Sequence, residues 1–138
     1  MSSSAKCLCG AVRIAVSSPV ETVGACHCNM CRRWGGGPLI AVNCGTHVSI
    51  EGQDSVSVFD SSPWAERGFC SRCGSHLFYR LKHNKHCYVP AGLFEGSQSL
   101  VFASQVFIDQ KPDYYAFANE TQNMTAAEIF AKFAPKSD

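Results

Sequence analysis

The sequence predicts a mainly β protein made of short antiparallel sheets, with one helix near the C-terminus. Three observations support this prediction. Short runs of β-branched and aromatic residues recur along the chain, Gly and Pro interrupt them at short intervals, and only one late segment has clear helical spacing. With 138 residues, of which 46% are hydrophobic, the chain can build one core, so we expect a single domain over residues 1–138.

The first expected strand lies in AVRIAV, residues 11–16, where Val12, Ile14 and Val16 alternate with other side chains and share one face. A compact apolar run, PLIAVNC, follows at residues 38–44. Residues 47–60 read as two short strands around a Gly-Gln-Asp turn. Further strands are expected in three aromatic or β-branched runs, at residues 76–81, 86–94 and 104–109.

One helix is expected from Thr125 to Phe133. Its apolar residues recur at helical spacing, at Ala126, Ile129, Phe130 and Phe133. Thr125 and Glu128 have the spacing of a capping box, in which each side chain bonds the other residue's backbone amide. Pro135 follows the expected end, because proline cannot continue a helix.

Charge and hydropathy exclude several classes of protein. The chain has 12 basic and 11 acidic residues and a net charge of +1, without the basic stripe that nucleic-acid and anionic-membrane binders usually show. We therefore expect no nucleic-acid and no membrane partner. No apolar run approaches the roughly 20 residues of a membrane helix. The first ten residues lack the apolar core of a signal peptide, so a cytoplasmic protein is expected.

The chain contains nine cysteines, an odd number, most of them in close clusters. In a reducing compartment such clusters are metal ligands more often than disulfides. Cys70 and Cys73 form a Cys-x-x-Cys-Gly turn that directs both sulfurs toward one point. Tetrahedral zinc, with bonds of about 2.3 Å, needs neighbouring sulfurs less than about 4 Å apart. Cys7 and Cys9, also followed by glycine, are the best second pair, and the four thiolates predict a closed zinc site. A thioredoxin-like redox motif is the less favoured alternative, because no strand–helix context surrounds it.

A second set, Cys26, Cys28 and Cys31, supplies three corners of a tetrahedron. Structural zinc sites are closed, whereas catalytic sites keep one position open for water or substrate. A fourth protein ligand remains possible, and the candidates are His27, Cys44, His47 and His76. The isolated Cys44 and Cys87 are better explained as small apolar residues of the core.

Basic residues and glycines follow the three-cysteine set directly, at Arg32, Arg33, Gly35 and Gly36. Three thiolates on Zn²⁺ leave a charge of −1, which favours nearby cations, although ordinary solvated surface explains such arginines equally well. Three thiolates also make zinc a weak Lewis acid, which disfavours hydrolysis and suits the binding of a thiol as thiolate. Glutathione or another small thiol carries carboxylates that the arginines and the glycine amides would bind.

Four motifs occur in order along the chain: CLCGAV, CHCNMCRR, FCSRCGSHLFYR and VFIDQKPDYYAF, from Cys7 to Phe117. In these motifs the chain resembles the glutathione-dependent formaldehyde-activating (GFA) family, which includes centromere-protein-V-like domains. The resemblance implies an Mss4-like, mainly β fold with two zinc ions per chain. The catalytic zinc would lie on Cys26, Cys28 and Cys31. The implied activity is formation or cleavage of a carbon–sulfur bond, as in S-(hydroxymethyl)glutathione.

Two other functions remain open at this point. A non-catalytic zinc module would bind a protein partner, and a lengthened basic tail, which this chain lacks, would favour it. A thiol-based binder of metals or metalloids is the second. Because the chain looks shorter than the enzymes for which the family is named, the physiological thiol and carbon fragment also stay open. Binding of a small thiol at one zinc alone would distinguish the enzyme from both alternatives.

Overall fold

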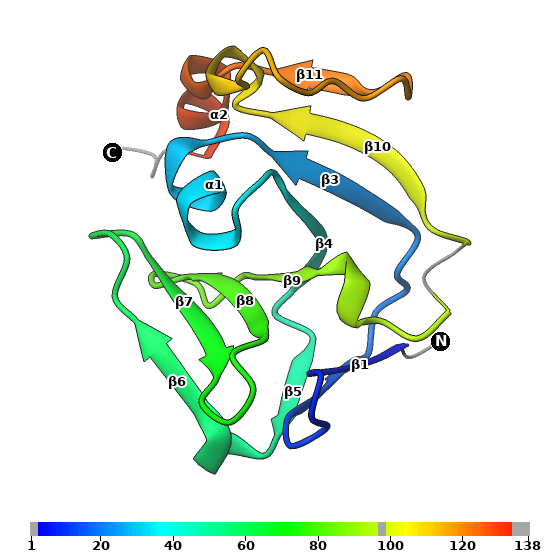
Figure 1. Ribbon diagram of the computed structural model, residues 1–138, viewed down its shortest axis with the longest axis vertical. Coiled ribbons are helices and arrows are strands. Elements are labelled where there is room, and N and C mark those ends of the chain that lie inside the picture. Colours follow the sequence, from blue (N-terminus) through cyan, green and yellow to red (C-terminus); the bar gives the residue numbers. More distant parts are fainter. Residues whose placement is uncertain (1–2, 97–98, 134–138) are drawn as a thin grey trace. The chain divides into compact units, whose positions relative to one another are not determined.

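The computed structural model describes residues 3–96 and 99–133, and these form two compact units. The first unit comprises residues 3–22, 41–96 and 99–100 of the described chain, and the second comprises residues 23–40 and 101–133. The strands and helices confirm the mainly β fold class (Figure 1). The expectation of one domain over residues 1–138 stays a prediction. Within the described residues, no helix has the length and apolar character needed to cross a membrane.

The first unit contains a small antiparallel sheet in the order β1-β2-β5. Its strands are β1 (Ser3–Lys6), β2 (Arg13–Val16) and β5 (Val48–Glu51). The expected alternation around β2 is confirmed, because Val12, Ile14 and Val16 are all at most 1% exposed. Strand β1 ends at Lys6, directly before Cys7, so packing of this sheet's apolar face fixes where the first cysteine pair starts.

A larger antiparallel sheet completes the first unit. Residues 41–45 of β4 (Leu39–Gly45) pair with β9 (Cys87–Pro90), and the order continues through β8 (His76–Leu81), β7 (Ala65–Cys70) and β6 (Val56–Phe59). A short 3₁₀ turn, η1 (Gln53–Ser55), separates β5 from β6. The two strands expected around this turn therefore exist, but each joins a different sheet.

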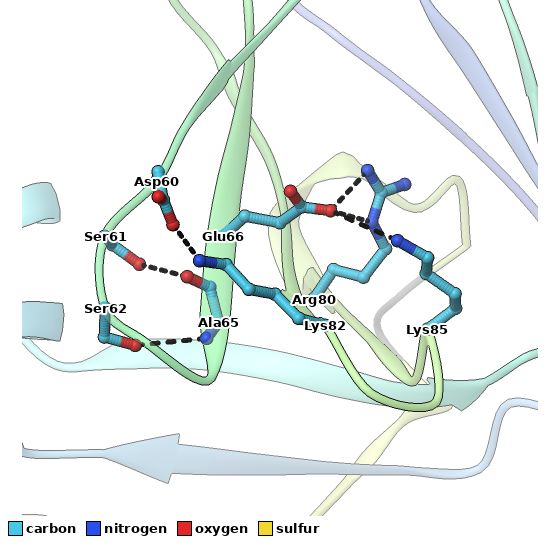
Figure 2. Close-up of polar contacts among 8 residues, drawn as sticks. All are labelled: Asp60, Ser61, Ser62, Ala65, Glu66, Arg80, Lys82 and Lys85. Atoms are coloured by element: carbon cyan, nitrogen blue, oxygen red, sulfur yellow. Dashed lines mark hydrogen bonds and ion pairs between the residues drawn. The ribbon is translucent and has the colours of Figure 1, made fainter.

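An ion-pair cluster joins β7 and β8 in this sheet (Figure 2). Glu66 and Arg80 are direct cross-strand partners, and the Arg80 Nε and Nη2 atoms both lie 2.8 Å from Glu66 Oε1. Lys85 Nζ lies 4.0 Å from the same oxygen, and Lys82 pairs with Asp60. The Glu66 and Arg80 side chains are only 18% and 24% exposed, so water screens this pair less than a surface pair.

The second unit holds a three-stranded arrangement in the order β11-β10-β3. Its elements are β3 (Thr22–Cys26), α1 (Asn29–Gly35), β10 (Val101–Val106), η4 (Ile108–Gln110), β11 (Gln122–Met124) and α2 (Ala126–Phe133). Strand β11 pairs with β10 in parallel, with Gln105 opposite Asn123. In Figure 1, helix α1 (cyan) follows directly after strand β3 (blue).

The predicted C-terminal helix is confirmed as α2. The Thr125 amide donates to Glu128 Oε1 at 3.0 Å, and the Glu128 amide donates to Thr125 Oγ1 at 3.2 Å, which is the expected capping box. Asp109 adds a further cap, because its Oδ1 accepts from the Ala126 amide at 2.9 Å. Pro135, expected just after the helix, lies outside the described residues.

A second, shorter helix, α1, departs from the expectation of a single helix. Its N-cap is Cys28, whose sulfur accepts a hydrogen bond from the Cys31 amide at 3.3 Å. It ends at Gly35, and the next residue, Gly36, caps it with a φ of +87°, the left-handed conformation common at helix C-termini. The sequence signal is weak because cysteine is not among the usual N-cap residues and the first turn has no acidic residue.

Two candidate metal centres

Four cysteines of the first unit form a closed cluster. The sulfurs of Cys7, Cys9, Cys70 and Cys73 all lie within 4.8 Å of one another. The Cys7–Cys9 sulfur distance is 3.6 Å and the Cys9–Cys70 distance is 3.8 Å. A tetrahedron with zinc–sulfur bonds of about 2.3 Å has edges of about 3.8 Å, so the donor set fits zinc. None of the nine cysteines, all of them in the described residues, forms a disulfide.

Two tight turns bring these sulfurs together. The Gly10 amide donates to the Cys7 carbonyl at 3.1 Å, and the Gly74 amide donates to the Cys70 carbonyl at 2.8 Å. Gly10 and Gly74 have φ values of +80° and +79°, which cost a residue with a side chain about 1–2 kcal/mol. The glycine after each cysteine pair therefore allows the chain to turn back behind its ligands.

Hydrogen bonds to sulfur favour the thiolate state of Cys7 and Cys73. At Cys9 a backbone bond to Ala11 lowers the pKa, but desolvation and the neighbouring sulfurs outweigh it and raise the pKa to about 11. Ser75 links the two turns, because its Oγ accepts from the Leu8 amide at 3.0 Å and lies 3.2 Å from the Cys73 sulfur. The bond from Ser75 is the largest influence on Cys73 and lowers its pKa to about 5. Burial raises the pKa of Cys7, but hydrogen bonds with the Val12 amide and the Cys9 and Cys70 sulfurs outweigh it and lower the pKa overall.

The second unit holds the three-cysteine cluster. Cys26 ends β3, Cys28 caps α1 and Cys31 lies in its first turn, and the three sulfurs are within 4.8 Å of one another. Among the residues that the structure describes, no further His, Cys, Asp or Glu joins this group. His27, one of the four candidates for a fourth ligand, is therefore outside it. The group therefore presents three of the four donors that a tetrahedral zinc site uses.

The other three candidates for a fourth ligand belong to the first unit. Cys44 is 1% exposed and, like Cys87 at 3%, belongs to the hydrophobic core, as predicted. Burial raises the pKa of Cys44 to about 12, which keeps its thiol neutral. His47 is exposed and His76 is half-buried.

Electrostatics show why the three-cysteine cluster suits a cation. Hydrogen bonding to Cys28 and Cys31, followed by burial, raises the pKa of the Cys26 thiol well above its ordinary value. Three thiols held this close resist ionising together, because each negative charge disfavours the next. A bound divalent cation removes this repulsion and stabilises all three thiolates.

The residues expected to bind a thiol's carboxylates divide into two groups. Arg32 is half-buried and its Nε donates to the His27 carbonyl at 2.9 Å, so part of its guanidinium supports the cluster. The Gly36 amide donates to the Arg32 carbonyl at 2.7 Å and closes helix α1, so this amide has a backbone partner although the residue itself is exposed. Arg33 and Gly35 are exposed.

The residues that hydrogen-bond to the three-cysteine segment from distant parts of the second unit were not predicted from the sequence. Gln110 Oε1 accepts from the Asn29 amide at 3.1 Å, at the first residue of α1. Gln105 and Tyr115 bind the His27 ring. These partners lie 78 to 88 positions from the cluster in sequence. Their only sequence signal is that Gln110 and Tyr115 fall within the fourth motif, VFIDQKPDYYAF.

Known proteins resemble this chain over most of its length. An uncharacterized lyase of Schizosaccharomyces pombe is 37% identical over 124 residues, which cover 89% of this chain and 90% of that protein. A putative glutathione-dependent formaldehyde-activating enzyme of Halomonas elongata is 37% identical over 82 residues, 52% of each chain. A crystal structure of a Rhodobacter sphaeroides protein matches with a TM-score of 0.55 and 25% identity, over 67% of this chain and 88% of that one.

The family match is broader than any local motif. It extends over residues 2–110, a range that contains all seven cysteines of the two clusters. The family is the one described as glutathione-dependent formaldehyde-activating enzyme. The S. pombe relative is similar over nearly the whole of both chains. The chain therefore belongs to the glutathione-dependent formaldehyde-activating enzyme family.

Proposed function

We propose that the protein is a zinc-dependent carbon–sulfur lyase acting on an adduct of a small thiol, such as S-(hydroxymethyl)glutathione. One observation carries the proposal: three sulfurs converge within 4.8 Å, and no fourth described His, Cys, Asp or Glu completes the set. Membership of a family named for glutathione and formaldehyde, and a relative named as a lyase, support the same chemistry.

The donor set decides what kind of catalyst this centre makes. Zinc bound by Cys26, Cys28 and Cys31 would hold the sulfur of the adduct as a thiolate in the open position. Because three thiolates donate much charge, the centre is poorly suited to activating water for hydrolysis. The four-cysteine cluster has no open corner, and we assign it a second zinc with a structural role.

The basic residues after the cluster supply binding rather than chemistry. Arg33 is exposed at the end of α1 and offers its guanidinium to a carboxylate of the thiol. Arg32 holds the His27 carbonyl through Nε. Gly35 is exposed beside them, and the φ of +87° at Gly36 turns the chain away from the end of the helix. These residues orient the thiol while its sulfur reaches the cysteine cluster.

The reaction balances without an oxidant or a reductant. When the adduct forms, the thiolate sulfur bonds to the carbonyl carbon of the aldehyde, and the carbonyl oxygen takes a proton from water. In the reverse direction the carbon–sulfur bond breaks, its electron pair stays on sulfur, and the hydroxyl proton returns to water. Water serves as the proton carrier in both directions.

Calorimetry with glutathione and S-methylglutathione tests the proposal. We expect glutathione to bind one site per chain, and the S-methyl compound to bind at least about tenfold more weakly, because a thioether cannot become a thiolate. Cys28→Ser is the matched control and should bind both compounds equally weakly. Equal affinity of the unaltered protein for the two compounds would contradict coordination of sulfur.

A further inference from the structure

His27 is a buried and fully hydrogen-bonded residue in the segment that carries the second unit's cysteines. It is 0% exposed, although it lies between the two candidate ligands Cys26 and Cys28. Consecutive side chains of an extended segment point to opposite faces, so the ring lies behind the strand that presents the sulfurs. A buried imidazole in that place needs partners for both of its nitrogens.

All four polar groups of His27 have a partner within the second unit. Ring atom Nε2 lies 2.8 Å from Gln105 Oε1, and Nδ1 lies 2.8 Å from the Tyr115 hydroxyl. The His27 amide donates to the Val106 carbonyl at 3.1 Å. The His27 carbonyl accepts from Arg32 Nε at 2.9 Å. The ring also stacks on Tyr115, with centroids 5.5 Å apart.

The direction of the hydrogen bonds can be followed along this chain of side chains. The Thr121 hydroxyl donates to Asn123 Oδ1 at 2.6 Å and accepts from Gln105 Nε2 at 2.9 Å. The Gln105 carbonyl oxygen therefore faces His27, and ring atom Nε2 carries the proton. Nδ1 then accepts from the Tyr115 hydroxyl, so a neutral ring of a single tautomer satisfies every partner.

These hydrogen bonds also restrict the positions of the neighbouring Cys26 and Cys28 sulfurs. With its ring and both backbone groups held, His27 has little freedom to rotate, and the Cα–Cβ directions of Cys26 and Cys28 are restricted with it. Sulfurs that must converge as thiolates repel one another until a cation binds. A segment held in place beforehand avoids part of the cost of ordering these ligands when the metal binds.

We propose that His27 is a positioning residue that keeps Cys26 and Cys28 converged and so sets the affinity of the three-cysteine centre for its metal. Gln105 and Tyr115 fix the ring in its orientation and tautomer. The proposal rests on the metal centre of the proposed function. It does not depend on which thiol that centre binds.

Metal affinity tests the role without any substrate. In His27→Leu, the affinity of the three-cysteine centre for Zn²⁺, measured by competition with a chelator, should fall about 10- to 100-fold. His27→Gln keeps an amide donor for Gln105 and should recover part of the loss. With Co²⁺ as the probe, the thiolate charge-transfer band should persist while the ligand-field bands shift, because the ligands remain and their geometry relaxes.

Two further variants keep the test decisive. Tyr115→Phe removes only the hydroxyl that reaches Nδ1 and should weaken metal binding by a smaller factor, even if His27→Leu does not fold. His86→Leu is the matched control, because His86 also bonds an amide oxygen, Asn43 Oδ1, but lies in the first unit. A lower melting temperature with unchanged zinc affinity and Co²⁺ spectrum in the His27 and Tyr115 variants would overturn the proposal. Failure of glutathione to bind, with the affinity losses intact, would overturn only the proposed function.

Discussion

The two cysteine clusters are built in opposite ways. The four-cysteine cluster takes ligands from two turns, and Cys9 and Cys70 are 61 positions apart. The three-cysteine cluster takes all its ligands from the six residues 26–31. Closing a long loop costs more chain entropy than closing a short one. A metal in the first cluster therefore restrains the fold, whereas a metal in the second restrains little of the chain.

The two clusters also differ in where their hydrogen-bond partners come from along the chain. Around the four-cysteine cluster, the hydrogen bonds come from the two turns themselves, through Ser75 and the Val12 amide. Around the three-cysteine cluster, they come from distant positions of the chain, such as Gln105 and Gln110. The comparison indicates that a metal in the first cluster would organise the protein, whereas in the second cluster the protein itself organises the ligands.

Loss of a ligand in the four-cysteine cluster should have the largest effect. Structural zinc contributes on the order of 10 kcal/mol to a small domain, against a typical net stability of about 5–15 kcal/mol. Cys70→Ser should therefore leave the protein largely unfolded or insoluble. Circular dichroism and the soluble fraction after expression would measure this. A soluble variant with a normal melting curve would remove the distinction between the clusters.

The corresponding change in the three-cysteine cluster should leave a folded protein. Cys28→Ser removes one sulfur, but serine is a preferred N-cap, so helix α1 keeps a cap at its first turn. Elemental analysis should give about one zinc per chain in place of two, and thiol-adduct chemistry should be lost. If Cys28→Ser unfolds the chain as badly as Cys70→Ser, the division into structural and catalytic centres is wrong.

Substituting the two arginines should have different effects: Arg32 should affect the stability of the protein, and Arg33 the binding of glutathione. Arg32→Ala loses a bond from a charged group to the His27 carbonyl and should destabilise the protein by about 1.5–3 kcal/mol. Arg33→Ala, at an exposed position, should change stability by less than about 0.5 kcal/mol. It should weaken glutathione binding about two- to fivefold, as expected for an exposed charge pair. Melting curves and calorimetry on both variants would check this, and identical behaviour would contradict it.

The smallest effect on the metal centres is expected from a change away from both clusters, in the ion-pair network of Figure 2. Glu66→Gln leaves the half-buried Arg80 guanidinium without its carboxylate and should lower the free energy of unfolding by about 1–3 kcal/mol. Zinc content and glutathione affinity should not change. Chemical denaturation of this variant would measure the change in free energy of unfolding, against which the larger losses expected in the clusters can be compared. A loss of zinc in this variant would show instead that the network supports a metal centre.

Local signals in the sequence were sufficient for much of the fold. The alternation at Val12, Ile14 and Val16 and the capping box at Thr125 and Glu128 depend on neighbours within a few residues, and both are confirmed. Cysteine spacing likewise predicted the local groups of sulfurs, because each turn is a local structure, whereas the joining of Cys7 and Cys9 to Cys70 and Cys73 depends on the tertiary fold.

Other features depended on distant partners and could not be predicted. The pairing of β10 with β11 in parallel, and the assignment of β5 and β6 to different sheets, are decided by tertiary packing. The polar partners of His27 lie at Gln105 and Tyr115, and no local pattern points to them. Helix α1 was missed because its cap is a thiol, which is not a usual start signal.

Because a thiol caps helix α1, the chemical shift of one amide proton should report the state of the three-cysteine cluster. The Cys31 amide proton points at the Cys28 sulfur over a nitrogen–sulfur distance of 3.3 Å. A proton in this place is deshielded more strongly by a sulfur anion than by a neutral thiol, and less strongly once a metal shares the sulfur's charge. In a ¹⁵N-labelled sample, the position of one cross-peak would therefore distinguish thiol, thiolate and metal-bound sulfur. The state of the cluster would be readable in an intact protein during turnover, without a dye, a chelator or a substituted metal.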